Sequence, residues 1–149
     1  MALDTVLVAV GPGDEERTEP IVTAVSDVAG PADAQVVLAH VFSRERFGDV
    51  VDRLDFEPGA DPDPDAVAAR HTTVQAFRDR LTDAGLDVTV RGSIGRAGDR
   101  IVELAEETDA GLVFVGGRKR RPSGKAVFGS TAQEVLLGAP CPVTFVRSE

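Results

Sequence analysis

The stretch that decides the fold is LVFVGGRKRRPSGKAVFGST, residues 112–131. It opens on the apolar run LVFV, which is typical of a buried strand, and this run ends in two glycines, Gly116 and Gly117. After a basic loop, Gly129 and the two hydroxyl residues that follow it are predicted to open a helix. Glycines let another group approach the backbone closely, and the first N–H groups of a helix attract negative charge. The stretch therefore predicts an anion site, with phosphate as its ligand.

Two nucleotide-binding motifs are absent from the sequence. The interval of thirteen positions from Gly116 to Gly129 is too long for the G-x-x-x-x-G-K-[ST] loop, and no G-x-G-x-x-G follows a predicted strand. Ser130 and Thr131 can cap the predicted helix, bind phosphate or do both. The basic loop can form an anion clamp over the helix start or pair as a solvated loop with nearby carboxylates. Both interpretations stay open for its basic residues, which are Arg118, Lys119, Arg120, Arg121 and Lys125.

The composition predicts one compact domain over residues 1–149. The net charge of −9, with 25 acidic against 16 basic residues, argues against binding to nucleic acid or to an anionic membrane. Such an acidic surface with only two lysines is typical of a salt-accumulating host, with an ordinary acidic composition as the alternative. No signal-like start and no apolar run of about 18 residues are present, so we expect a cytoplasmic protein. The single cysteine, Cys141, can form no intramolecular disulfide.

Apolar β-branched runs alternate with segments of helical periodicity, which is the pattern of a mainly parallel α/β sheet. The predicted strands are 6–10, 35–42, 86–90, 112–115 and 143–146. The predicted helices are 15–29, 66–84, 99–108 and 130–137, the first of them stopped by Gly30-Pro31. Residues 43–65 have neither period and carry three prolines, so they are predicted to form a surface loop.

The order of the strands in the sheet follows from their composition. The third strand alternates apolar and polar residues, which indicates an edge, and right-handed crossovers then favour a doubly wound, five-stranded sheet of order 3-2-1-4-5. Ligands of such sheets bind where the chain reverses direction, here between the first and fourth strands. The ends of these two strands are Gly11-Pro12-Gly13 and Gly116-Gly117. Topology and glycine pattern thus predict the same site.

From residue 5 to residue 147 the chain resembles the universal stress protein family, as a haloarchaeal-type member. The resemblance rests on the order of the elements and on four segments, VLVAV at 6–10, LAHV at 38–41, SIGRAGDRIVELAEETDAGLVFVGG at 93–117 and GSTAQEVLLGAPCPVTFVR at 129–147. It implies an adenine nucleotide alpha hydrolase-like fold with helices on both faces of the sheet. It also implies a role in stress response and a homodimer that associates through the last strand.

ATP-binding members of that family carry the motif G-2x-G-9x-G-[ST]. On this sequence its outer glycines fall on Gly116 and Gly129 and its hydroxyl on Ser130, but its middle glycine falls on Lys119. A glycine there would let the backbone approach a polyphosphate, whereas a lysine offers an ammonium group instead. The motif is therefore incomplete.

A second departure lies at the end of the first strand. ATP-binding members resemble V-D-G-S there and place an Asp against adenine and ribose, whereas this chain has Gly11, and Asp14 comes three residues too late to take that role. About half of the ATP signature is retained. The resemblance implies these ligand-binding candidates: Gly11, Val41 through its backbone, Gly116, Lys119, Gly129, Ser130 and Thr131.

Little in the sequence supports catalysis, and we expect no enzyme. His40 is predicted to be a satisfied core or strand-end histidine and His71 to lie on a helix surface, and no metal-ligand spacing or G-x-S-x-G motif is present. Two hypotheses remain. The chain is a dimeric stress-response protein with weak or altered binding of ATP, another adenine nucleotide or phosphate, or it is a nucleotide-independent interaction module like the family's non-ATP-binding branch.

Overall fold

A computed structural model describes residues 3–11, 13–54, 62–117 and 129–147. The predicted basic loop, with the candidate Lys119, lies outside these residues. Within the described part, no helix is long and apolar enough to cross a bilayer.

The strands form one parallel sheet of order β3-β2-β1-β4-β5, which confirms the predicted topology. The strand bounds are β1 Thr5–Ala9, β2 Gln35–Phe42, β3 Val88–Ile94, β4 Leu112–Gly117 and β5 Val143–Arg147. β1 pairs with β2 on one side and with β4 on the other, so the chain reverses direction there. The switch point therefore lies between β1 and β4, as predicted.

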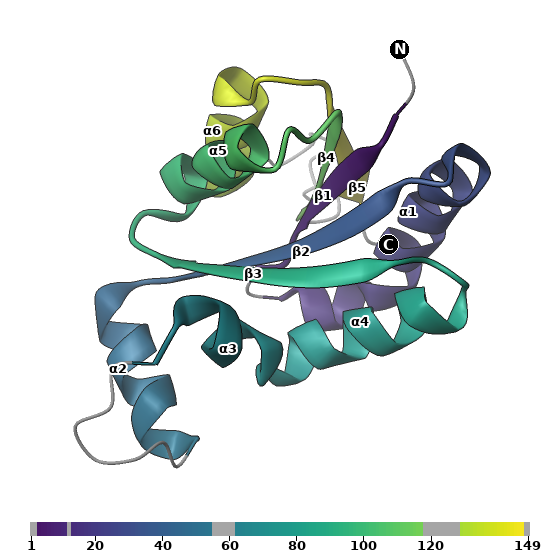
Figure 1. Cartoon of the computed structure of the whole chain (residues 1–149). Helices are drawn as coiled ribbons and strands as arrows, with labels where there is room; N and C mark the ends of the chain where they lie inside the picture. Colours follow the sequence, from purple (N-terminus) through teal and green to yellow (C-terminus); the bar gives the residue numbers. More distant parts are fainter. Residues whose placement is uncertain (1–2, 12, 55–61, 118–128, 148–149) are drawn as a thin grey trace, which may run out of the picture.

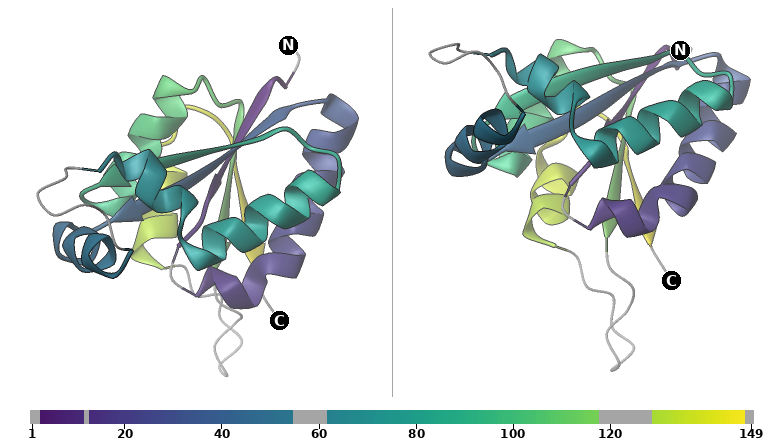
Figure 2. Two further views of the ribbon diagram at one scale, coloured as in Figure 1. Left: turned by 60° about the horizontal axis from the view of Figure 1, so that its bottom comes forward. Right: turned by 90° about the horizontal axis from the view of Figure 1, so that it is seen from below.

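Helices cover both faces of the sheet (Figures 1 and 2). α1 Thr18–Ala32 and α4 Thr72–Asp83 pack on one face, and α5 Ala97–Glu107 and α6 Ser130–Gly138 pack on the other. A short 3-10 turn, η1 Asp14–Arg17, precedes α1. Two further helices, α2 Arg44–Arg53 and α3 Pro64–Ala69, lie beyond the end of β2 and beside β3 (Figure 1).

The central strands are buried on both faces because their side chains alternate between two cores. Val6 and Val8 of β1 belong to the core under α1 and α4, whereas Leu7 and Ala9 belong to the core under α5 and α6. Phe114 in β4 is fully buried in the first of these cores. The continuous apolar runs of the sequence are thus explained by double burial.

Several of the predicted boundaries are wrong, most clearly those of α1 and β3. α1 continues through Gly30-Pro31 to Ala32 and ends at Asp33, whose φ of 54° is left-handed. A proline loses its own backbone N–H, but its fixed φ is close to helical, so one more partial turn can follow it. β3 begins and ends later than the predicted 86–90, because the pairing with β2 extends to Ile94.

The predicted surface loop 43–65 is also wrong where the structure describes it. Ser43 accepts a hydrogen bond from the Arg46 N–H and caps α2. Phe47 of α2 packs with Phe42 and Val67 in a third small core, so one face of this charged helix is buried. The predicted helix 66–84 is in fact two helices, because α3 ends at Ala69 and α4 starts at Thr72.

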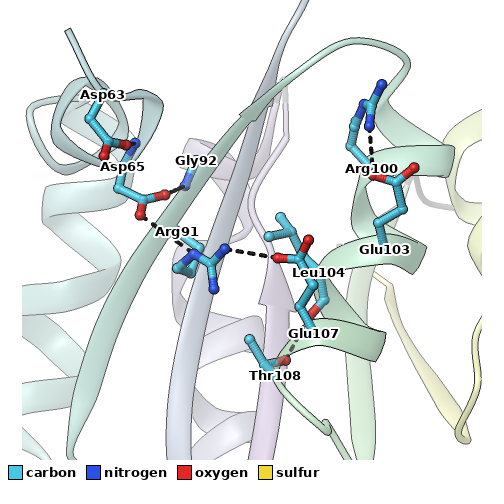
Figure 3. Close-up of polar contacts among 9 residues, drawn as sticks. All are labelled: Asp63, Asp65, Arg91, Gly92, Arg100, Glu103, Leu104, Glu107 and Thr108. Carbon is cyan, nitrogen blue, oxygen red and sulfur yellow. Dashed lines mark hydrogen bonds and ion pairs between the residues drawn. The ribbon is translucent and has the colours of Figure 1, made fainter.

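The β3 edge of the sheet is covered by the start of α3 (Figure 3). The Asp65 carboxylate accepts a hydrogen bond from the Gly92 N–H at 2.7 Å, so this backbone donor is not open to another strand. Arg91 contacts Asp65 on one side, with 3.5 Å between Nε and Oδ2, and donates to Glu107 of α5 at 2.9 Å on the other. These contacts tie α3, β3 and α5 together.

Gly92 is required by this close approach. A Cβ atom at this position would overlap the Pro64 carbonyl at the start of α3 and would come within 3.0 Å of the Ala68 Cβ. We expect Gly92→Ala to lower the free energy of unfolding by about 1–3 kcal/mol, measured by chemical denaturation, because backbone has to move to admit the methyl group.

Gly48→Ala is the matched control for this substitution. Gly48 lies within α2, is exposed and has open space around its Cα, so alanine there should stabilise the protein by about 0.5–1 kcal/mol. If both variants unfold like the parent chain, the contact between α3 and β3 does not constrain the fold.

Candidate functional site

A pocket of about 360 Å³ lies at the carboxyl ends of β1 and β4, where the topology predicts it. This volume is within the usual range for sites that bind small molecules. Six of the seven predicted candidates line it, and the seventh, Lys119, is outside the described residues. The six are Gly11, Val41, Gly116, Gly129, Ser130 and Thr131. Residues from the ends of β1, β2 and β4 and from the start of α6 therefore meet around one cavity.

The start of α6 forms one wall of the pocket. Gly129 is the N-cap residue, with φ of −66°, and no side chain caps the first turn among the described residues. Ser130 and Thr131 already lie inside α6, after the N-cap Gly129, so the interpretation that either hydroxyl caps this helix is wrong. The first N–H groups of α6 thus carry the positive end of the helix dipole into the pocket.

The lining of the pocket also contains Asp14 and Arg17 of η1, which the sequence reasoning missed. The turn at Gly13, with φ of 84°, folds η1 back, so Asp14 Oδ2 accepts the Gly11 N–H at 2.7 Å. Asp14 Oδ1 pairs with Arg17 Nη1 at 2.7 Å, and Arg17 Nε donates to the Gly117 carbonyl at 2.9 Å. Only the D-x-x-R spacing just after a glycine-rich strand end could have suggested this contact.

Asp14 is 4% exposed, and this burial raises the pKa of its carboxyl group. The hydrogen bond from Gly11 and the Arg17 guanidinium act in the opposite direction, because both favour the carboxylate. On balance burial has the larger effect and the pKa of Asp14 is raised, and Asp14 and Arg17 form an ion pair at the wall of the cavity.

The glycines at the end of β4 are required by packing inside the protein. A Cβ atom at Gly116 would come within 2.7 Å of Asp14 Oδ1 and 2.9 Å of Ile21 Cδ1. At Gly117 it would overlap the ring of Phe145. Gly129 differs, because a Cβ there would meet none of the described atoms within 4 Å. Gly129 lines the pocket, so packing against the described residues does not account for a glycine there.

The apolar part of the pocket comes from the ends of β1, β2 and β4 and from the start of α5. Val41 and Val115 contribute from the sheet, and Ala97 and Ile101 from α5. Neither α5 residue was among the predicted candidates, and Ala97 lies before the predicted helix start at residue 99. An apolar floor beside polar walls suits a ligand with one flat organic part and one charged part.

The two histidines lie next to the pocket, behind the end of β1. His40 is 8% exposed, and its Nδ1 donates to the Val10 carbonyl at 2.7 Å, which confirms the prediction of a satisfied core histidine. His71 is not on a helix surface as predicted. It is the N-cap residue of α4, and its ring centroid is 4.3 Å from that of His40.

Both imidazoles are held neutral by their surroundings. The pKa of His40 is lowered to about 4, mainly by burial and to a smaller extent by His71 and Arg46, with the hydrogen bond to Val10 acting in the opposite direction. Burial also lowers the pKa of His71, with Arg46 acting in the same direction and Glu15 in the opposite one. Because the folded state disfavours protonation of these two imidazoles, the free energy of unfolding is expected to fall as the pH falls.

A doubly wound parallel sheet with helices on both faces and a polar, glycine-lined pocket at its switch point places this protein in the class of open α/β proteins. Comparison with known proteins then gives the family. The sequence pattern of the universal stress protein family matches residues 2–147, and the chain belongs to that family.

Known relatives share the fold. A universal stress protein from Mycolicibacterium smegmatis is 36% identical over 84 residues, which is 56% of this chain and 65% of that relative, just under two thirds of its length. A universal stress protein structure from Archaeoglobus fulgidus is similar with a TM-score of 0.69 and 26% identity, over 96% of this chain and 98% of the other.

Two similar structures contain adenine nucleotides. A universal stress protein from Archaeoglobus fulgidus in complex with dAMP has a TM-score of 0.65 and 23% identity, over 98% of this chain and 99% of the other. A universal stress protein in complex with cAMP has a TM-score of 0.66 and 21% identity, over the full length of both chains. At these identities the likeness supports a common fold.

The depressed pKa of His40 predicts a stability that depends on pH. Between pH 6.5 and about 4 the unfolded chain binds a proton at this residue that the folded chain does not, so stability falls as pH falls. We expect His40 alone to cost about 2 kcal/mol of unfolding free energy between pH 7 and pH 5, measured by urea denaturation at each pH.

The control is His40→Gln, which cannot titrate in this range. Its absolute stability is lower because the packing against Phe42 and His71 changes, but the slope of its stability against pH should be shallower than that of the parent chain. Equal slopes for the two proteins would contradict the assignment of this acid sensitivity to His40.

Proposed function

We propose that this protein is a dimeric stress-response protein that binds an adenine nucleotide, or a smaller phosphate compound, weakly or in an altered manner at the switch-point pocket. One observation carries the proposal. The first turn of α6 has no side-chain cap among the described residues and opens into a pocket of ligand size. Binding and not catalysis is the proposed activity.

The parts of the pocket fit the two halves of a nucleotide. A purine ring suits the apolar surface of Val41, Ala97 and Ile101, and a phosphate suits the N–H groups that start α6. The relatives that hold dAMP and cAMP support the adenine part of this proposal. The altered manner follows from Gly11, which offers no carboxylate of its own, and from Lys119 in place of the middle glycine.

The alternative is a nucleotide-independent interaction module. It is favoured by a specific observation, because Gly116 and Gly117 are explained by the packing of Asp14 and Phe145 without any ligand. Gly116, one of the outer glycines of the ATP motif, would then serve the fold alone. The open space at Gly129 favours the ligand instead, and we therefore place nucleotide or phosphate binding first.

We also propose that the homodimer forms through β5. In the described part of the sheet β5 pairs only with β4, and Val143, Thr144, Phe145 and Val146 are all half-buried. The other edge, β3, is covered by α3 and Asp65. A second copy that pairs its β5 with this one in an antiparallel manner would bury these side chains across a two-fold axis.

Isothermal titration calorimetry with ATP, ADP, AMP and cyclic AMP tests the ligand proposal. We expect heat with at least one of the four, and we expect Gly129→Ala to weaken that binding by about tenfold, because its methyl group stands where the ligand approaches the helix. The melting temperature should stay close to that of the parent, because a φ of −66° suits alanine and the space is open.

Gly48→Ala serves as the matched control, since it adds the same methyl group at an open position that does not line the pocket. It should bind like the parent. Absence of heat with all four nucleotides from the parent chain would reject nucleotide binding and leave the interaction module.

Sedimentation equilibrium tests the dimer. We expect a dimer at tens of micromolar, and we expect Val143→Lys to shift it to monomer, because a lysine on an edge strand opposes pairing with another strand. Val88→Lys places the same residue on the opposite edge, β3, and should remain dimeric. A monomeric parent chain, or a dimer lost equally in both variants, would reject association through β5.

A further inference from the structure

Arg17 lines the pocket, and its side chain is only 13% exposed, which is unusual for an arginine. Buried guanidinium groups are retained where they have partners, since an isolated buried charge is costly. Arg17 has two partners among the described residues, Asp14 and the carbonyl of Gly117. Asp14 is in turn fixed by the Gly11 N–H, so the position of the guanidinium is set by the backbone at the ends of β1 and β4.

The guanidinium has donors to spare. It carries five N–H bonds, and the contacts with the described residues use one on Nε and one on Nη1. The group lines the same cavity as Gly129, Ser130 and Thr131 of the α6 start. The lining of this cavity therefore combines the N–H groups of a helix start with a guanidinium, and proteins use both kinds of group to hold phosphate.

We propose that Arg17 is a phosphate-binding residue of this pocket, with Asp14 as the positioning residue that holds its guanidinium toward the cavity. The ligand class is a phosphate monoester or pyrophosphate compound. The identity of its organic part as adenosine rests on the proposed function above, whereas the role of Arg17 toward the phosphate does not.

A purely structural role would give the same contacts, because Arg17 also joins η1 to the end of β4. The two roles differ in what they predict for ligands. A structural pair affects the binding of adenosine and AMP alike, since both need the same intact cavity. A phosphate-binding arginine affects AMP and leaves adenosine nearly unchanged.

The test measures the dissociation constants of adenosine and AMP by calorimetry for the parent chain and for Arg17→Gln. Their ratio reports what the phosphate adds to binding. We expect AMP to bind more tightly than adenosine to the parent, and we expect Arg17→Gln to reduce the ratio by about tenfold, the loss of one charge-assisted hydrogen bond. Arg100→Gln removes the same charge from α5 outside the pocket and should leave the ratio unchanged.

The double variant Asp14→Asn with Arg17→Gln guards against misfolding, because it removes both charges and leaves neither buried alone. Its ratio should match that of Arg17→Gln. A ratio that stays at the parent value in either folded variant overturns the role of Arg17.

Pyrophosphate separates this inference from the proposed function. If the parent chain binds no adenosine and no AMP, the adenine proposal fails, and the melting temperature in pyrophosphate decides the role of Arg17. A rise for the parent and for Arg100→Gln that is lost in Arg17→Gln supports it. No rise for the parent, or an equal rise in Arg17→Gln, overturns it.

Discussion

The contact between η1 and the end of β4 is the constraint on which the pocket depends. Parallel strands with helices on both faces leave a gap at the switch point, and here the gap is bordered by a turn that folds back from β1 onto β4. The fold-back needs Gly13 in a left-handed conformation and needs space above Gly116. Asp14 and Arg17 then satisfy each other and two backbone groups, so a buried ion pair replaces unpaired polar atoms.

The pairing of backbone polar groups with side chains also distinguishes the two edges of the sheet. At β3 the carboxylate of Asp65 receives a backbone N–H that another strand could otherwise pair with, and Arg91 links this corner to α5 (Figure 3). Gly92 is the residue that lets α3 come this close. At β5 no helix start takes a comparable position among the described residues, and Val143 to Val146 are half-buried along this edge, where we propose that a second copy pairs. One edge of the sheet, β3, is thus covered by α3, whereas the described residues place no such cover over the other edge, β5.

Charge is distributed unevenly in relation to the pocket. The chain as a whole has a net charge of −9, which repels phosphate compounds at long range. The start of α6 and the guanidinium of Arg17, which is paired with Asp14, line the pocket and provide positive partial charge at short range. The paired histidines behind β1 are kept neutral by burial and by Arg46, so they add no charge near neutral pH.

The sequence by itself determined the fold class, the order of the strands, the bounds of β2 and the place of the pocket. Each of these follows from patterns that are local in the chain. Apolar runs at 6–10 and 112–115 and glycines at their ends identify doubly buried strands and a switch point. The helix at 44–53 was missed because its apolar face is narrow and contacts only a small core of Phe42, Phe47 and Val67.

Only the tertiary structure decided which polar groups meet at the site. Asp14 was set aside because it follows the strand end by too many residues, yet a 3-10 turn brings its carboxylate back to the Gly11 N–H. Arg17 reaches a carbonyl one hundred positions away, and no local pattern encodes that contact. His71 likewise meets His40 through the packing of α4 against β2. Contacts between distant segments depend on how backbones pack, and so they appear only once the sheet and its helices are assembled.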